Sequence, residues 1–298
     1  VYKRQTVYAG MLIFFFVVLL SDVKITTEAF SNIFSLNSIL DVNNLAPLLT
    51  VAGTIFAYFS ILIISFGDFS RYVKNEQELK KGNLSLILNL IIFSFLSVFV
   101  VTGSDVFLNQ KFSDIDRIFT NPTDIVGKFD NIQITIVVLF FIIIASASTN
   151  LVANFIPSQY SLINFAPSIL SLKSASYLIA FFGLLIAIFW LTILSQIGIL
   201  SFVDTFGAFF GPLFGVMAAD YYLIKNQELS NKDLYSIDKE SAYYYSGGWH
   251  IKGVYSLILG FIFSASTIWN TNLMFLQSYA WIIGAFVAWM TYYLLAKK

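Results

Sequence analysis

Cysteine is absent from this chain of 298 residues, and histidine occurs once, at His250. Without cysteine the chain has no disulfide framework, no thiolate nucleophile and no cysteine-ligated metal site. With one histidine, we expect no histidine-based metal or acid–base chemistry. Charge is also scarce, because only 11% of the residues are charged and the formal net charge is zero. No basic surface therefore points to nucleic acid, and an enzyme would have few groups to work with.

Hydrophobic residues make up 58% of the chain, which predicts an all-α polytopic membrane protein. Eight apolar runs are long enough to cross a bilayer, and no linker separates a second domain. The chain is therefore interpreted as a single transmembrane domain, residues 1–298. The eight predicted spans are residues 7–22, 46–67, 84–103, 132–156, 175–194, 199–224, 253–269 and 274–296.

Lysine and arginine are distributed unequally between the connections of these spans. If the N-terminus is cytoplasmic, thirteen of the seventeen lie in inner segments, and the four outer ones are Lys24, Lys111, Arg117 and Lys128. This predicts a multi-pass protein of the cell (inner or plasma) membrane with both ends cytoplasmic. The chain begins at Val1 and has no signal peptide, which we interpret as truncation at the N-terminus of a longer protein.

Residues 145–157, with the sequence ASASTNLVANFIP, place polar side chains in the end of an otherwise apolar helix. Ala145, Ser148 and Thr149 share one helical face and offer carbonyl and hydroxyl oxygens, which suit sodium. Asn150 and Asn154 share the neighbouring face, and their amides suit a planar ligand with its own amide edges. The alternative is that these small and polar residues only pack and hydrogen-bond against another helix.

Two further pairs are candidates at the second span. Phe56 and Phe59 could stack on a planar ligand, although an aromatic residue is weak evidence in a chain with 32 phenylalanines. Asp68 and Arg71 are spaced so that they can pair at the cytoplasmic end. Anchoring of that end is the favoured role of Asp68 and Arg71, and gating is the alternative.

The sixth span contains Asp204, the one acidic residue that could lie appreciably inside the membrane. We expect Asp204 to be an N-cap or first-turn carboxylate, with a proton or ion site as the alternative. Gly207, Gly211 and Gly215 form a smooth face for close packing or for a bend, and Pro212 is expected to kink the helix.

Three other segments receive structural interpretations. Residues 158–171 are bracketed by prolines and are expected to lie at the cytoplasmic interface. His250 is interpreted as a solvated loop residue. The aromatic residues of the last two spans, which include Trp281 and Tyr292, are expected to anchor those helices at the membrane interface.

Four motifs in order resemble the nucleobase:cation symporter family, which comprises purine-cytosine permeases and uracil, allantoin and hydantoin transporters. They are GDFSRY at 67–72, STNLVAN at 148–154, GPLFGVMAADYYLI at 211–224 and YYYSGGWHIKGVYSLILG at 243–260. The resemblance covers essentially the whole chain. It implies the inverted-repeat sodium-symporter fold, with these spans as helices five to twelve of twelve and the first four absent.

The resemblance also implies roles for individual residues. Ala145, Ser148 and Thr149 match sodium-site positions, and Asn150 and Asn154 match positions that hydrogen-bond the substrate. Phe59 lies where relatives place an aromatic residue, often Trp, against the planar ring. Phe at this position retains stacking but lacks the indole donor, which leaves the substrate class open.

We therefore expect a monomeric secondary transporter that imports a nucleobase-like solute with sodium, or alternatively a proton, and needs no cofactor. A membrane-embedded enzyme acting on lipid would need converging acid–base or metal ligands. A structural or partner-binding subunit would leave the polar faces of residues 148–154 unexplained. As given, the 298 residues are expected neither to transport nor to bind nucleobase without four upstream spans.

Overall fold

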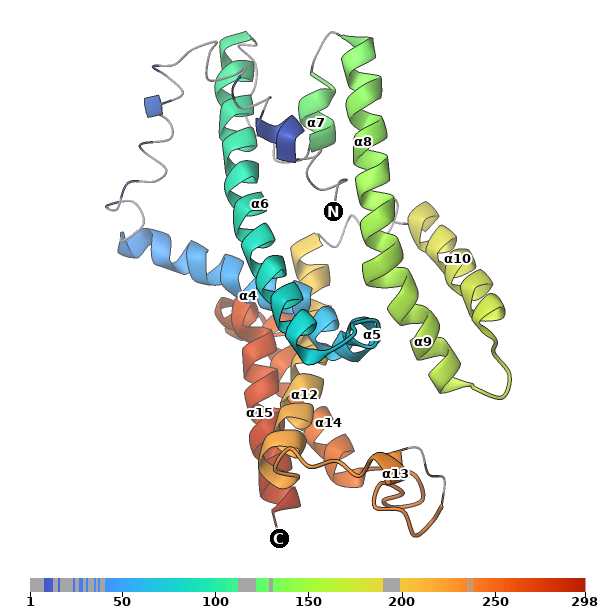
Figure 1. Ribbon diagram of the computed structural model, residues 1–298. Coiled ribbons are helices and arrows are strands. Elements are labelled where there is room, and N and C mark those ends of the chain that lie inside the picture. Colours follow the sequence, from blue (N-terminus) through green and yellow to red (C-terminus); the bar gives the residue numbers. More distant parts are fainter. Residues whose placement is uncertain are drawn as a thin grey trace. The chain divides into compact units, whose positions relative to one another are not determined.

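The computed structural model consists of helices and connecting loops, with one isolated β-bridge between Ser246 and Trp249 (Figure 1). It describes residues 8–12, 16, 24, 27, 28, 31, 35, 37, 41–111, 122–128, 131–189, 199–234, 236 and 238–297. Within this part of the chain, seven helices are long and apolar enough to cross a membrane. They are Val42–Ile64, Glu76–Ser104, Thr135–Phe165, Leu172–Phe189, Phe202–Ile224, Ile251–Trp269 and Thr271–Ala296.

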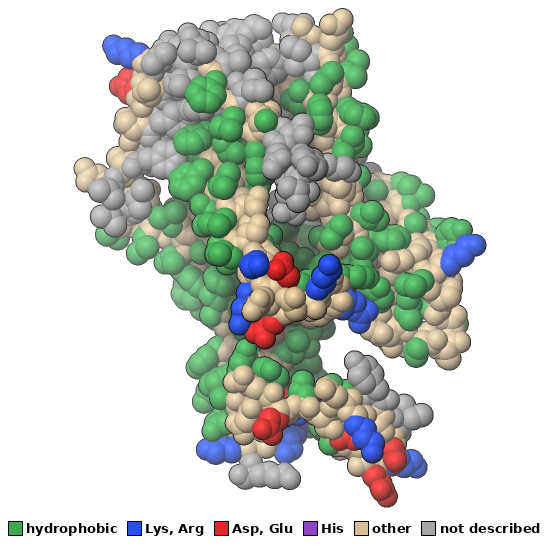
Figure 2. All heavy atoms as spheres, in the orientation of Figure 1, with side chains coloured by type: hydrophobic (Ala, Val, Ile, Leu, Met, Phe, Trp, Pro, Cys, Tyr) green, Lys and Arg blue, Asp and Glu red, His purple; other side chains and the backbone are tan. Residues whose placement is uncertain are grey.

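These seven helices overlap the last seven predicted spans, so the predicted all-helical class is confirmed for the described residues. The first predicted span, residues 7–22, lies largely outside them. Large apolar side chains such as Leu84, Ile143 and Phe181 are exposed on the helix sides. Figure 2 shows apolar side chains along the helices, with charged side chains mainly at loops and helix ends. Such extensive apolar surface fits contact with lipid.

The chain divides into two compact units. The first comprises Val1–Asn44 and Asp68–Leu172, and the second comprises Leu45–Gly67 and Lys173–Lys298. Three short helices, α5, α7 and α13, lie in the connections and cover Phe66–Ser70, Pro122–Val126 and Asn231–Leu234.

In the first unit, the start of α6 (Glu76–Lys111) is fixed by its local sequence. The side chain of Asn75 accepts a hydrogen bond from the backbone N–H of Glu78 (2.9 Å), as an N-cap does. Glu76 lies in the first turn, where a negative charge is favoured, and pairs with Lys80 one turn later (2.7 Å). Both side chains are highly exposed, so this pair positions the helix end more than it stabilises the fold.

The first unit also contains a long helix made of three consecutive segments, α8 (Ile132–Asn150), η1 (Leu151–Phe155) and α9 (Ile156–Phe165). The hydropathy pattern predicted that this helix ends before Pro157 and that residues 158–171 form a separate segment at the membrane interface. That boundary is wrong, because the helix continues through the proline to Phe165. Pro157 lies in the first turn of α9, a position where a proline is tolerated.

The core of the second unit consists of α12 (Ile199–Ala219), α14 (Ile251–Trp269) and α15 (Ala280–Ala296), which pack against one another. A single π-helical turn, η3, extends α12, and a 3₁₀ segment, η4, leads into α15. The remaining segments of this unit are α4 (Val42–Ile64), α10 (Leu172–Phe189), η3 (Asp220–Ile224) and η4 (Thr271–Tyr279).

Small residues allow the helices of the second unit to approach closely. Three glycines of α12 each face a backbone group or a small side chain of a neighbouring helix, which supports the predicted close-packing role of this face. The helix continues through Pro212 to Ala219. The contacts are Gly207 with Ala57, Gly211 with the carbonyl of Trp281, and Gly215 with the carbonyl of Ala285.

Two aromatic residues predicted to be interface anchors are interior residues instead. Trp281 and Tyr292 retain only 7% and 2% of their accessible surface. Trp281 packs with Ala57 and Ala285, and Tyr292 is part of the neighbouring buried cluster. The prediction was wrong for these residues because a membrane-facing aromatic and a packed one look alike in sequence.

The close approach at Gly211 predicts a stability difference between two glycines. A Cβ at Gly211 would meet the backbone carbonyl of Trp281, whereas a Cβ at Gly183 would meet no neighbouring atom. Gly211→Ala should lower the free energy of unfolding by about 1–3 kcal/mol through overpacking. Gly183→Ala should leave it unchanged or raise it slightly, because alanine favours helix. Thermal unfolding in detergent measures both, and equal melting temperatures would contradict the packing argument.

Candidate functional site

The predicted cation-binding residues lie in the last turns of α8. The Ser148 hydroxyl donates a hydrogen bond to the backbone carbonyl of Ala145 (2.9 Å), so the two oxygens are adjacent. Because the hydroxyl uses its proton in this bond, the lone pairs of Ser148 Oγ can still face a cation. Thr149 follows on the same helix and its side chain is exposed. The structure thus brings together two of the predicted oxygens, and the ion itself stays a prediction.

The two predicted amides form a hydrogen-bonded ladder along the same helix. Asn150 Nδ2 donates to the carbonyl of Ser146 (3.1 Å), and Asn154 Nδ2 donates to Asn150 Oδ1 (2.5 Å). The ladder orients both amides while each NH₂ group keeps a second proton and Asn154 keeps its carbonyl oxygen. Both side chains are exposed. Further donors and an acceptor can therefore meet a ligand on this face.

A π-helical turn, η1, begins directly after Asn150 and contains Asn154. In η1 the N–H of Ile156 bonds to the carbonyl of Leu151, five residues earlier instead of four. Single π turns inside α-helices occur frequently at functional sites. The sequence analysis did not predict this turn, because helical periodicity does not encode such a local change of hydrogen-bond spacing.

The predicted stacking residues lie on α4, in the second unit. Phe56 is stacked on Trp281, with 5.7 Å between the ring centroids, and Phe59 contacts Tyr58 edge to face (5.2 Å). One face of Phe56 is therefore occupied by the protein, whereas Phe59 is half-buried. The helix α4 belongs to the second unit and the amide ladder to the first. The role of Phe56 and Phe59 in substrate binding stays a prediction.

The turn after α5 is attached to α9 by aromatic contacts instead of the suggested Asp68–Arg71 pair. Arg71 lies over the ring of Tyr160, with its guanidinium carbon 4.5 Å from the centroid, and the hydroxyls of Tyr72 and Tyr160 are hydrogen-bonded. No ion pair joins Asp68 and Arg71, both of which the structure describes. These contacts attach the turn to α9, and both predicted roles of Asp68 and Arg71, anchoring at the membrane interface and gating, stay predictions.

Asp204 does not cap a helix, which corrects the prediction. It lies beyond the first turn of α12 and is 5% exposed. Its carboxylate accepts a hydrogen bond from the side-chain amide of Gln277 in η4 (3.0 Å). The carboxylate therefore joins two segments of the second unit. Spacing within α12 gave no sign of this distant partner.

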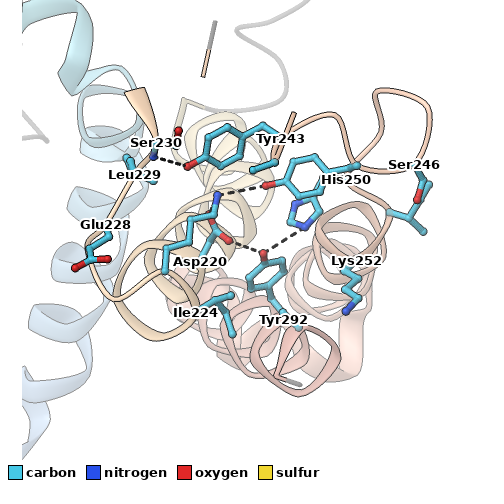
Figure 3. A pocket seen from close by; sticks show the side chains of 15 residues that line it. Asp220, Ile224, Glu228, Leu229, Ser230, Tyr243, Ser246, His250, Lys252 and Tyr292 are labelled. Atoms are coloured by element: carbon cyan, nitrogen blue, oxygen red, sulfur yellow. Dashed lines mark hydrogen bonds and ion pairs between the residues drawn. The ribbon is translucent and has the colours of Figure 1, made fainter. Parts of the chain in front are cut away.

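The loop after η3 contains a polar cluster that the sequence analysis missed (Figure 3). The Asp220 carboxylate accepts a hydrogen bond from the Tyr292 hydroxyl (2.6 Å) and forms an ion pair with Lys225 (2.9 Å). Lys225 also donates to the hydroxyl of Tyr245 (3.3 Å), whose ring stacks on His250 with a 4.0 Å centroid separation. The cluster borders a cavity of about 700 Å³. His250 is thus a packed residue, contrary to the prediction of a solvated one.

Hydrogen bonding fixes the tautomer of His250. The Tyr292 hydroxyl uses its proton on Asp220, so its oxygen accepts from His250 Nε2–H (3.3 Å). Protonation must then occur at Nδ1, which faces Gly253 in the first turn of α14. A positive charge there would meet the positive end of the helix.

The cluster shifts two pKa values outside the membrane spans. Burial lowers the pKa of His250, and Lys225 and Lys252 act in the same direction, while Asp220 acts against them. Burial also disfavours the charged form of Lys225, but the hydrogen bonds to Asp220 and Tyr245 outweigh burial and raise the pKa of Lys225. Neutral His250 beside a charged Lys225–Asp220 pair is therefore the stable arrangement at neutral pH.

This arrangement predicts acid sensitivity. Because the pKa of His250 is lower in the folded than in the unfolded chain, folding loses stability as pH falls below about 6.5. The melting temperature of the parent protein should fall between about pH 7 and pH 5, and His250→Gln should reduce this slope. Thermal unfolding across a pH series measures the difference. His250 is the only histidine, so parallel slopes would exclude it as the cause.

Comparisons with known proteins identify the family. Residues 3–293 match the family described as permeases for cytosine/purines, uracil, thiamine and allantoin. The chain is 28% identical to an allantoin permease of Bacillus subtilis over 82% of this chain and 48% of the permease. It is 25% identical to the purine-uracil permease NCS1 of Arabidopsis thaliana, over 81% of this chain and 41% of the permease.

A putative allantoin permease of Escherichia coli is 25% identical over 84% of this chain and 50% of that protein. The chain thus spans about half the length of the curated relatives it matches. No solved structure gives a significant match. The family match extends over nearly the whole chain, and the chain therefore belongs to the family of permeases for cytosine/purines, uracil, thiamine and allantoin.

Proposed function

We propose that this chain forms part of a secondary transporter that imports a nucleobase or a related planar heterocycle together with a cation. The observation that carries the proposal is the amide ladder of Asn150 and Asn154 around the π turn of a membrane-spanning helix. The family match and the allantoin and purine-uracil permeases among its relatives support the same class.

The chemistry of the ladder suits this cargo. Uracil, cytosine and allantoin present N–H and C=O groups in one plane, and an amide offers both a donor and an acceptor. A site that hydrogen-bonds its ligand discriminates strongly, because a ligand lacking a partner leaves a polar group of the site unpaired. Asn154 keeps its carbonyl oxygen for such a bond, and Asn150 keeps one amide proton.

The adjacent oxygens supply a place for the coupled cation. Ala145 O and Ser148 Oγ are neighbours, and Thr149 adds a third oxygen on the same face. Among the described residues, no group of three or more His, Cys, Asp or Glu could hold a metal ion. Neutral oxygens suit a monovalent ion such as sodium, and a proton is the alternative coupling ion. Such an ion promotes transport only if it binds one transporter state more tightly than the other.

Membrane insertion follows from the seven apolar helices, and the distribution of lysine and arginine favours a cell membrane with both chain ends cytoplasmic. We infer that the transporter works as a monomer without a cofactor. Uptake of radiolabelled uracil, cytosine and allantoin into proteoliposomes of the complete transporter of which this chain forms part, with and without a sodium gradient, tests the proposal. Uptake no greater than in protein-free liposomes for all three solutes would count against it.

The amide ladder makes a prediction about substrate recognition. Asn154→Ala should abolish uptake, and Asn150→Ala should reduce it less, because each substitution removes an amide donor and acceptor proposed to bind the solute. Asn164→Ala is the matched control, since Asn164 is an exposed asparagine of the neighbouring α9. Initial uptake rates are compared at equal amounts of inserted protein. Unchanged rates in both ladder variants would assign the amides to helix packing.

The oxygen pair makes a separate prediction about the ion. Ser148→Ala or Thr149→Ala should raise the sodium concentration for half-maximal substrate binding, by roughly 5- to 150-fold if coupling has its usual size. Ser146→Ala is the control, because Ser146 lies in the same turn but outside the proposed face. Substrate binding is measured as a function of sodium. If the parent protein binds substrate equally well without sodium, the cation is a proton.

A further inference from the structure

A buried carboxylate, Asp204, lies inside the second unit, whereas the amides and oxygens proposed to bind substrate and sodium belong to the first unit. Asp204 is on membrane-spanning α12 and is 5% exposed. Gln277 of η4 donates to it (3.0 Å), and Thr54 of α4 also hydrogen-bonds to it. Both partners are neutral. Three segments of the chain therefore meet at a carboxylate that forms an ion pair with no Lys or Arg in the described part of the chain.

The surrounding helices supply no counter-charge. α4 and η4 contribute only the phenols of Tyr58 and Tyr279 as ionisable groups, and α15 contributes those of Tyr292 and Tyr293. The one positive side chain within the helices packed around α12 is Lys252. It lies in the first turn of α14, beside the loop cluster at the opposite end of α12. An ionised carboxylate without a counter-charge is disfavoured in a low-dielectric interior.

The next turn of the same contact contains a polar group without a hydrogen-bond partner. Trp281 Nε1 is buried and has no hydrogen-bond partner in the described structure. The Cδ1 atom bonded to this nitrogen faces Gly207, one turn after Asp204 on α12. An indole N–H can only donate, and orphaned buried donors are rare. The interface thus contains the unpaired N–H of Trp281 and the carboxylate of Asp204, which can accept further hydrogen bonds.

We propose that Asp204 is a proton-binding site whose protonation state is coupled to the contact between α4, α12 and η4. When these segments are packed, the neutral acid is favoured: the carboxylate takes up one proton, forms an O–H bond and loses its charge. When they separate and water enters, the ionised form is favoured and the proton is released. Binding and packing therefore stabilise each other, as linkage requires.

This inference rests on the proposed transport function only for its physiological role. During transport, the proton would be a second coupled ion, bound by a carboxylate, whereas the sodium site uses neutral oxygens. If Asp204 had only a structural role, asparagine could replace it, because the asparagine carbonyl oxygen accepts the same hydrogen bonds. Asparagine cannot bind the proton, so it cannot replace a proton-binding Asp204.

Infrared difference spectroscopy of the full chain during a pH titration tests proton binding directly. We expect a carbonyl-stretch band of a protonated carboxylic acid that disappears in Asp204→Asn and persists in Asp233→Asn, a control in the short connecting helix α13. Asp204→Glu should retain a band with a changed midpoint, so the test survives if the asparagine variant fails to fold. A band that persists in Asp204→Asn, or no band in the parent protein at any pH, would overturn the proposal.

Uptake driven by a proton gradient separates this proposal from the transport function. In Asp204→Asn, the solute accumulation driven by a proton gradient should fall roughly 5- to 150-fold while substrate binding is retained. The control Asp233→Asn should accumulate solute as the parent protein does. If Asp204→Asn keeps the parent's pH profile, proton coupling at Asp204 is wrong although transport stands. If the parent transports nothing but the Asp204 band titrates, the proton site stands and the proposed function fails.

Discussion

Hydrocarbon offers no hydrogen bonds, so every polar group at membrane depth needs a partner within the protein. Many of the polar side chains described on the membrane-spanning helices meet that requirement with a backbone carbonyl. Ser148 bonds to Ala145 one turn earlier, and Ser264 of α14 bonds across to the carbonyl of Ala280 (2.5 Å). Side chains with capacity left after these bonds, such as the amide ladder and Asp204, are therefore the places where function is expected.

The same constraint explains the packing of the second unit. Helices in lipid gain little from burying apolar side chains against each other, so they gain from close van der Waals contact. Glycines on α12 allow its backbone to approach the carbonyls of Trp281 and Ala285. This contact also holds α4 and η4 beside Asp204, and a small motion of these segments would change the surroundings of its carboxylate.

Hydropathy predicted the seven later helices because length and apolarity alone determine which segments can span a bilayer. Spacing also placed Asn150 and Asn154 on one face, since residues four apart on a helix are neighbours. Spacing could not reveal the π turn that follows Asn150 and contains Asn154, because such a turn depends on local hydrogen-bond geometry. Nor could it find the bond from Tyr292 to Asp220, because residues 72 positions apart meet only through tertiary packing. For that reason His250 and Tyr292 were assigned to the surface.

The chemistry of the two units suggests a division between neutral and ionisable groups. The amide ladder and the oxygens of Ala145 and Ser148 are uncharged, which suits an uncharged heterocycle and a weakly held monovalent ion that must also be released. Ionisable groups lie elsewhere, with Asp204 inside the second unit and the Asp220–Lys225 pair at its loop. Because a buried charge changes its protonation when water reaches it, such groups report helix separation, whereas amides and hydroxyls do not. On these proposals, recognition by neutral groups and response by ionisable groups can vary independently.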